Sequence, residues 1–108
     1  MALVWWCAAG ALTVLSAALF KREIAILAAA NPAGRLPWIG WPVNTPRSAR
    51  ALGCFAVLAE VFAVNCVLEA QGRHHLYDFL WVLPQGLVVA AAAAVSQARH
   101  NRRVGRAA

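Results

Sequence analysis

Three long apolar segments, separated by short polar ones, dominate the pattern of this chain. They run from about residue 2 to 20, from 49 to 70 and from 76 to 98. A helix of ~20 apolar residues is long enough to cross the hydrocarbon core of a bilayer, where a helix satisfies its own backbone hydrogen bonds. The pattern therefore predicts an all-α integral membrane protein with three transmembrane helices, built as one membrane domain over residues 1–108.

The segment 21–48 is predicted to be a loop at one side of the membrane, and residues 99–108 a basic tail on the same side. A short apolar stretch at 24–30 either continues the first helix or lies along the interface, because it is too short to cross alone. Beyond this stretch the density of proline excludes a regular helix. The prolines stand at positions 32, 37, 42 and 46.

Charge is distributed unevenly along the chain. The chain contains ten Lys and Arg residues but only four Asp and Glu residues. Hydrophobic residues make up 62% of the chain, compared with ~45–50% in a typical soluble domain. Nine of the ten basic residues lie between the first two apolar segments or after the third. Because basic residues mark cytoplasmic loops, we expect the N-terminus outside and the C-terminus inside, with the cations facing anionic lipid headgroups. Their placement beside apolar segments argues against nucleic-acid binding.

The tryptophans support this topology, because Trp favours the level of the headgroups. Trp5, Trp6 and Trp81 are expected in an outer belt, and Trp38 and Trp41 in an inner one within the proline-rich loop. The same residues are candidate contacts for a partner subunit.

Small residues recur at helical spacings of three and four in each apolar segment. Helices in lipid meet where small side chains let the backbones approach. The sequence therefore predicts a packing face on each helix. The residues concerned are Gly53, Ala56 and Ala63 in the second segment, Gly86 and Ala90 in the third, and Gly10 in the first.

Glu60 is the strongest functional candidate, because it is an ionisable residue near the middle of the second apolar segment. Such a group costs ~2.5–3.5 kcal/mol on insertion scales. No Lys or Arg stands at mid-depth, so desolvation favours the neutral acid, and Thr13 and Ser16 are the partners expected within the chain. Three interpretations stay open: a hydrogen-bonded link between helices, a contact with a partner subunit, or a proton-handling group. Asn65 and Gln85 are further intramembrane polar candidates.

The sequence predicts no catalytic residue and no metal site. Cys7, Cys54 and Cys66 all fall in apolar segments, where cysteine behaves as a small buried hydrophobe. His74 and His75 are adjacent and point in different directions, so they rarely hold one ion together. No nucleophile–base set or phosphate-binding loop is present. We therefore expect no enzyme activity and no resident cofactor, while a bound lipid or quinone stays open.

These features favour a small non-catalytic accessory subunit of a larger integral-membrane complex of respiratory or photosynthetic type. Other integral-membrane subunits are then its partners. We expect a multi-pass protein of the plasma (inner) membrane of a bacterium, with an organellar inner membrane as the alternative.

Two other functions fit the same pattern. Three spans with this orientation and a basic tail resemble one holin architecture, in topology alone, which implies a self-associating pore former. A small proton- or cation-coupled transporter or channel subunit could instead use Glu60. Small multidrug exporters use a membrane glutamate in this way, although they have four spans and carry it in the first.

Overall fold

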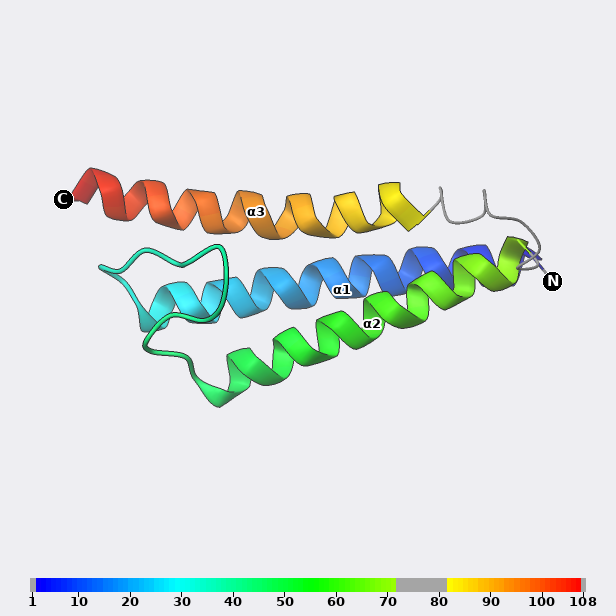
Figure 1. Cartoon of the computed structure of the whole chain (residues 1–108), viewed down its shortest axis with the longest axis horizontal. Coiled ribbons are helices and arrows are strands. Elements are labelled where there is room, and N and C mark those ends of the chain that lie inside the picture. Colours follow the sequence, from blue (N-terminus) through cyan, green and yellow to red (C-terminus); the bar gives the residue numbers. More distant parts are fainter. Residues whose placement is uncertain (1, 72–81, 108) are drawn as a thin grey trace.

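A computed structural model describes residues 2–71 and 82–107, which form three helices and the loop between the first two. They are α1 (Ala2–Ala30), α2 (Arg47–Gln71) and α3 (Val82–Ala107). The helices run along an elongated molecule of 52 × 24 × 19 Å (Figure 1). The end of α1, the start of α2 and the end of α3 lie together, and we call this the basic end. The prediction of an all-helical chain is confirmed.

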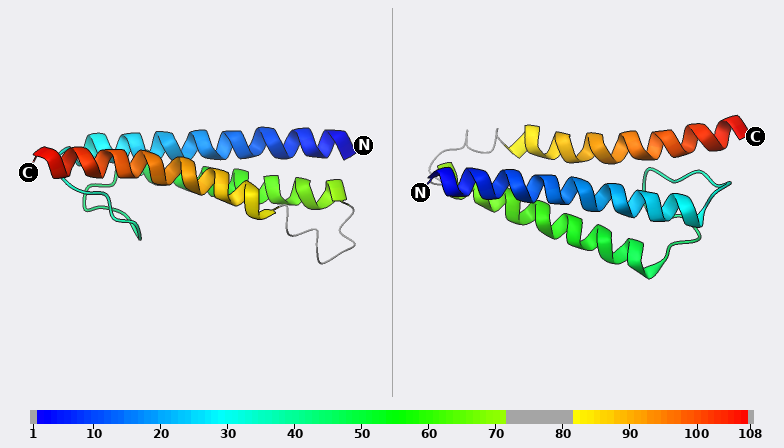
Figure 2. Two further views of the ribbon diagram at one scale, coloured as in Figure 1. Left: turned by 90° about the horizontal axis from the view of Figure 1, so that it is seen from above. Right: turned by 180° about the vertical axis from the view of Figure 1, so that it is seen from behind.

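Helix α1 is the centre of the bundle. It packs against both α2 and α3, whereas α2 and α3 barely touch each other (Figure 2). The bundle is therefore thin, and each outer helix is covered by protein on one side only.

Helix α1 runs without interruption through the short apolar stretch 24–30, since no helix breaker precedes Pro32. Its end is closed by Asn31, whose backbone amide and side-chain Nδ2 both donate to the carbonyl of Leu27, at 3.0 and 2.9 Å. Of the two predicted courses for this stretch, the structure shows the continued helix.

The loop and the tail differ from their predicted bounds. The loop between α1 and α2 spans 31–46 rather than 21–48. The basic tail 99–108 is not an extension beyond the helix, because α3 continues through it to Ala107. The first part of the predicted third span, 76–81, lies outside the described residues.

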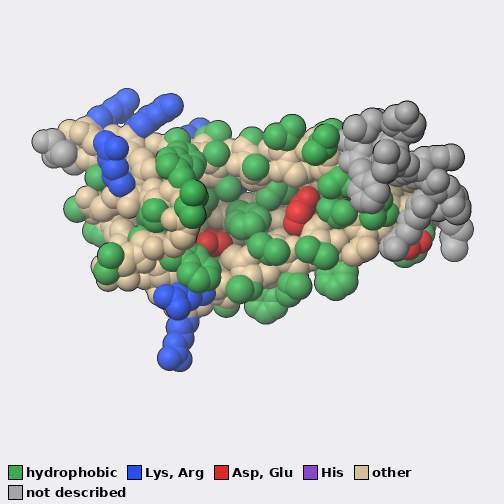
Figure 3. Space-filling model, viewed as in Figure 1, with side chains coloured by type: hydrophobic (Ala, Val, Ile, Leu, Met, Phe, Trp, Pro, Cys, Tyr) green, Lys and Arg blue, Asp and Glu red, His purple; other side chains and the backbone are tan. Residues whose placement is uncertain are grey.

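Two helices, α1 and α2, are long and apolar enough to cross a membrane. The described part of α3 does not share this property, since its last turns are rich in arginine. Large hydrophobic side chains are exposed along the molecule, while Lys and Arg gather at the basic end (Figure 3). Large apolar patches are rare on the surface of soluble monomers, and these exposed side chains fit the two helices that are apolar enough to cross a membrane.

The seam between α1 and α2 is built from small residues. Gly53, Ala56 and Ala63 of α2 are buried in it. Ser16 of α1 is fully buried and its Oγ donates to the carbonyl of Ala56 at 2.8 Å. A side chain this short reaches a neighbouring helix backbone only because the two helices approach closely, as the stripe on α2 predicts.

The small residues predicted to pack in the other two helices do not form the contacts between the described helices. Gly10 and Ala90 are exposed, and a Cβ added at Gly10 or Gly86 would meet nothing within 4 Å. Helix α3 instead uses Ala93, which packs against the apolar cluster that contains Ile24. Alanine is so frequent in α3 that several faces carry a small-residue stripe, and spacing alone does not choose between them.

Candidate functional site

Two adjoining cavities form a groove beside the α1–α2 seam, with volumes of about 540 and 310 Å³. They share Phe20 of α1 and Val57 of α2. The lining is almost wholly apolar, yet it contains the carboxylates of Glu23 and Glu60, so we call it the carboxylate groove. Further walls are Trp41, Cys54, Leu58, Val61, Val64 and Asn65.

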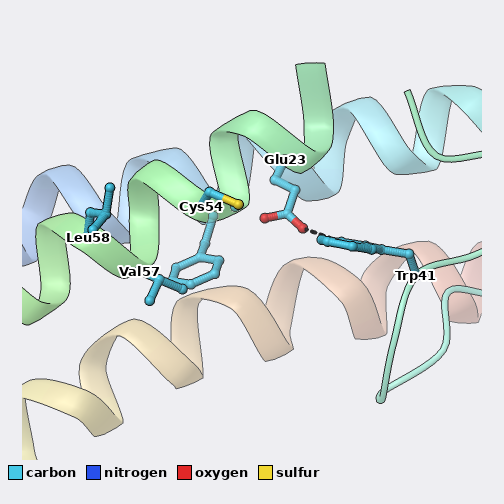
Figure 4. A pocket seen from close by; sticks show the side chains of 7 residues that line it. Glu23, Trp41, Cys54, Val57 and Leu58 are labelled. Carbon is cyan, nitrogen blue, oxygen red and sulfur yellow. Dashed lines mark hydrogen bonds between the residues drawn. The ribbon is translucent and has the colours of Figure 1, made fainter. Parts of the chain in front are cut away.

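Glu23 enters the groove from α1 and points toward Trp41 (Figure 4). Its side chain is buried, and its Oε1 accepts a 3.4 Å hydrogen bond from Trp41 Nε1. Its Oε2 is buried without a hydrogen-bond partner among the described residues. A buried acceptor left without a donor is costly, so this oxygen marks an incomplete polar site.

Gly53 makes room for the Glu23 carboxyl. A Cβ built on Gly53 would lie 2.5 Å from Glu23 Oε2, so the carboxyl at the end of this flexible side chain would have to move. Gly53 therefore belongs to the groove as well as to the helix seam, and its lack of a side chain allows Glu23 to occupy its position.

Trp41 closes the groove at the basic end. The guanidinium of Arg50 lies 5.1 Å from the centroid of the Trp41 ring, within the range of a cation–π contact. The indole is thus held between Arg50 on α2 and Glu23 on α1. Both tryptophans predicted at the inner interface are exposed, and Trp41 also lines the groove.

Glu60 lies half-buried on α2 in the second cavity. Both carboxyl oxygens are buried, and neither has a hydrogen-bond partner among the described residues. The expected bonds to Thr13 and Ser16 are not formed: Ser16 donates to the Ala56 carbonyl, and Thr13 accepts from Gln85. Within the described chain, Glu60 is therefore not the hydrogen-bonded link that one interpretation predicted.

The other intramembrane polar candidates have structural partners. Gln85 Nε2 donates to Thr13 Oγ1 at 2.8 Å, which ties α3 to α1, while Gln85 Oε1 is buried without a partner among the described residues. Asn65 Nδ2 donates to the carbonyl of Val61 on its own helix at 3.2 Å. The Gln85 bond therefore holds α3 against α1, whereas the Asn65 bond stays within α2, and Asn65 also lines the groove.

Two of the three tryptophans predicted for the outer belt lie among the described residues. Trp5 and Trp6 are both exposed near the start of α1. Trp81 lies outside the described residues, as do His74 and His75.

The sequence analysis did not identify Glu23 as a site residue. Glu23 follows Lys21 and Arg22, so it resembles a charged residue at the membrane interface. A signal was present in the helical spacing. Ser16, Phe20, Glu23 and Leu27 follow one another at steps of four, three and four, and therefore share one face of α1. Once α1 continues past residue 20, that face carries Glu23 into the seam.

A polar contact between α3 and the loop was also missed. Gln97, His100 and Asn101 form what we call the loop clasp. Asn101 Oδ1 accepts from Leu36 N at 2.7 Å and its Nδ2 donates to Leu36 O at 3.1 Å. Gln97 Nε2 also donates to Leu36 O, at 3.1 Å, and His100 Nε2 lies 2.9 Å from Gly34 O. The signal was the spacing of three and four from Gln97, at the end of the predicted third span, to His100 and Asn101 in the basic tail.

Within 2–71 and 82–107, no three His, Cys, Asp or Glu side chains gather as they would for a metal ion. The cysteines are free thiols. Cys66 is buried, as expected, but Cys7 and Cys54 are exposed, so they face the surroundings of the bundle instead of its core.

Comparison with protein-family models, with curated proteins and with solved structures found no match to this chain. The chemistry of the carboxylate groove is therefore the basis for a functional proposal. It presents acceptor oxygens without donors in apolar surroundings, which suits a hydrogen-bond donor or a cation.

Proposed function

We propose that this chain is a small non-catalytic accessory subunit of a larger integral-membrane complex of respiratory or photosynthetic type, in the inner membrane of a bacterium. In this proposal the chain spans the membrane three times, and the carboxylate groove receives a membrane helix of the partner subunit. The observation that carries the proposal is Glu60, whose two buried carboxyl oxygens lack a hydrogen-bond partner among the described residues.

Charge complementarity determines the chemistry of the partner helix. The groove holds the carboxyl groups of Glu23 and Glu60, and its lining residues include no Lys or Arg. Ionisable groups in membranes pair with one another when they face protein. We therefore infer that the partner helix carries a Lys or Arg at the depth of Glu60.

The shape of the bundle supports a helix as the occupant. Because α2 and α3 barely touch, protein does not fill the space beside the open flank of α2. That flank exposes Val57 and Val61 on either side of Glu60. An apolar helix that carries one Lys or Arg would cover Val57 and Val61 and would also donate to the Glu60 carboxyl.

The test is affinity purification of the tagged chain in a mild detergent, followed by native mass determination. We expect unlike subunits at a fixed stoichiometry. Glu60→Gln should reduce their affinity by at least about 100-fold, since breaking a buried ion pair costs ~3–5 kcal/mol. Glu69→Gln is the matched control, because Glu69 is an exposed carboxylate of the same helix, and it should leave the complex intact.

Two results would contradict this proposal. A pure homo-oligomer would favour the holin-like pore former. If Glu60→Gln were silent while Glu60→Leu released the partner, a neutral hydrogen bond would replace the proposed cation.

A second function is favoured by the size of the groove. Cavities of about 540 and 310 Å³ beside two carboxylates can hold a small lipophilic cation, as a proton- or cation-coupled transporter requires. In that case Glu60→Gln would abolish efflux of a probe such as ethidium while the oligomer stayed intact. An apolar lining would also admit a lipid tail or a quinone, and copurified small molecules would reveal either.

A further inference from the structure

A separate cavity of about 260 Å³ lies between α1 and α3 at the basic end. Lys21 comes from α1, and Arg99 and Arg103 come from α3, one helical turn apart. No acidic residue lines this cavity, and it shares no residue with the carboxylate groove. Three cations from two helices therefore converge on one small space without a counter-charge in its walls.

The chemistry of these side chains suits a phosphate group. Each arginine presents a planar fork that matches two phosphate oxygens, and lysine adds a compact charge. His100 forms part of the wall and is fixed in place, because its Nε2 contacts the carbonyl oxygens of Asn31 and Gly34 at 3.1 and 2.9 Å. The loop clasp thus stabilises one side of the cavity.

Apolar surface leads to this cavity along both helices. Val88, Val95 and Arg99 share one face of α3, at steps of seven and four, and both valines are exposed. On α1, Val14 lies two turns before Lys21 on the same face and is 70% exposed. A molecule with a phosphate in the cavity would thus lay hydrocarbon chains along exposed valines.

We propose that this cavity binds the phosphate headgroup of an anionic membrane lipid, with the acyl chains along the valines of α1 and α3. Basic pockets between membrane helices recognise such headgroups. The proposal does not depend on the carboxylate groove or on the accessory-subunit function.

The experiment uses the full chain in a mild detergent and counts bound lipids by native mass spectrometry. The probes are dioleoyl phosphatidylglycerol, dioleoyl phosphatidylcholine and inorganic phosphate. We expect one phosphatidylglycerol to be retained in preference to phosphatidylcholine. The triple variant Lys21→Gln, Arg99→Gln, Arg103→Gln should weaken this retention by at least ~10-fold, since each cation near a headgroup contributes severalfold.

A matched triple variant, Arg22→Gln, Arg47→Gln, Arg106→Gln, removes the same charge from exposed positions of the same end that do not line the cavity. We expect its phosphatidylglycerol affinity to stay within ~2-fold of the original. The single variant Arg103→Gln changes an exposed residue near the end of α3, so it should fold normally and still weaken retention.

Three outcomes would overturn the proposal. Equal losses in the two triple variants would show attraction to the overall charge of the basic end. Displacement of phosphatidylglycerol by millimolar inorganic phosphate would assign the cavity to a soluble phosphate compound. Retention of the two lipids to the same extent would show that the headgroup charge is not recognised.

Discussion

At the scale of single residues, Glu23 and Glu60 differ in how the fold holds them. Glu23 has one oxygen bonded to Trp41 and the other against Gly53, so its position depends on its neighbours. Glu60 has no hydrogen-bond partner among the described residues, although both its oxygens are buried. We therefore expect substitutions around Glu23 to change the stability of the bundle, and substitutions of Glu60 to change what the bundle binds.

The first prediction concerns the close approach of Gly53 to Glu23. Gly53→Ala places a Cβ 2.5 Å from Glu23 Oε2 and must displace the carboxyl from Trp41. Gly10→Ala is the matched control, since its Cβ meets nothing within 4 Å. Both changes gain the same helix propensity, and the group that must move is the end of the flexible Glu23 side chain, so Gly53→Ala should lower the free energy of unfolding by about 1 kcal/mol relative to Gly10→Ala. Unfolding by SDS in mixed micelles, followed by circular dichroism, measures the difference.

Both glycine substitutions are repeated in a Glu23→Ala variant, to test whether the Glu23 carboxyl causes the loss of stability. Once the carboxyl is removed, Gly53→Ala and Gly10→Ala should have the same effect on the free energy of unfolding. A difference that persists without Glu23 would mean that the α1–α2 backbones, and not the carboxyl, exclude the Cβ.

At the scale of elements, α3 has two roles. Its apolar half packs on α1 through Ala93, and its basic half holds the loop 31–46 through the loop clasp. The clasp bonds join residues more than sixty positions apart in the chain. The loop carries Trp41, so the clasp also positions the residue that closes the carboxylate groove.

The second prediction tests the clasp. Asn101→Ala removes both bonds to Leu36 and leaves the buried Leu36 without its side-chain partner for N–H. Such a loss costs ~1–3 kcal/mol, so amide hydrogen exchange across the loop should accelerate by about 10-fold or more. Mass spectrometry of the peptide covering 31–46 measures it. Arg106→Ala, an exposed residue on the same helix, should leave the exchange rate unchanged.

At the scale of the whole molecule, the basic end determines the expected orientation. Nine of the ten Lys and Arg belong to the segments that meet there. Basic residues are retained on the cytoplasmic side. The chain should therefore insert with its N-terminus outside and both the loop and the end of α3 inside.

The third prediction tests whether the N-terminus lies outside and the basic end inside. The three native cysteines, Cys7, Cys54 and Cys66, are first replaced by alanine. Ala2→Cys and Val43→Cys are then introduced one at a time, each as the single thiol that can be labelled. Val43 is suitable because it is 99% exposed. A membrane-impermeant maleimide should label Ala2→Cys in spheroplasts and label Val43→Cys only after permeabilisation. The reverse pattern would place the basic end outside.

The sequence by itself determined the parts of this protein that depend on local pattern. Long apolar segments predicted helices, prolines from position 32 onward predicted that no regular helix runs through the loop, and the small residues of α2 predicted its packing face. Each of these follows from neighbours within a few positions, through helix periodicity, backbone sterics or the size of a side chain. The membrane crossing of the third segment, the orientation and the accessory function stay predictions.

Only the tertiary structure decided which faces of α1 and α3 are used for packing. Abundant alanine offered α1 and α3 several equivalent stripes, and the faces predicted through Gly10 and Ala90 were not those used. The burial of Glu23, the missing partner of Glu60 and the loop clasp all depend on contacts between residues distant in sequence. A buried polar group is defined by what surrounds it in space, and a sequence read through local spacing does not contain that information.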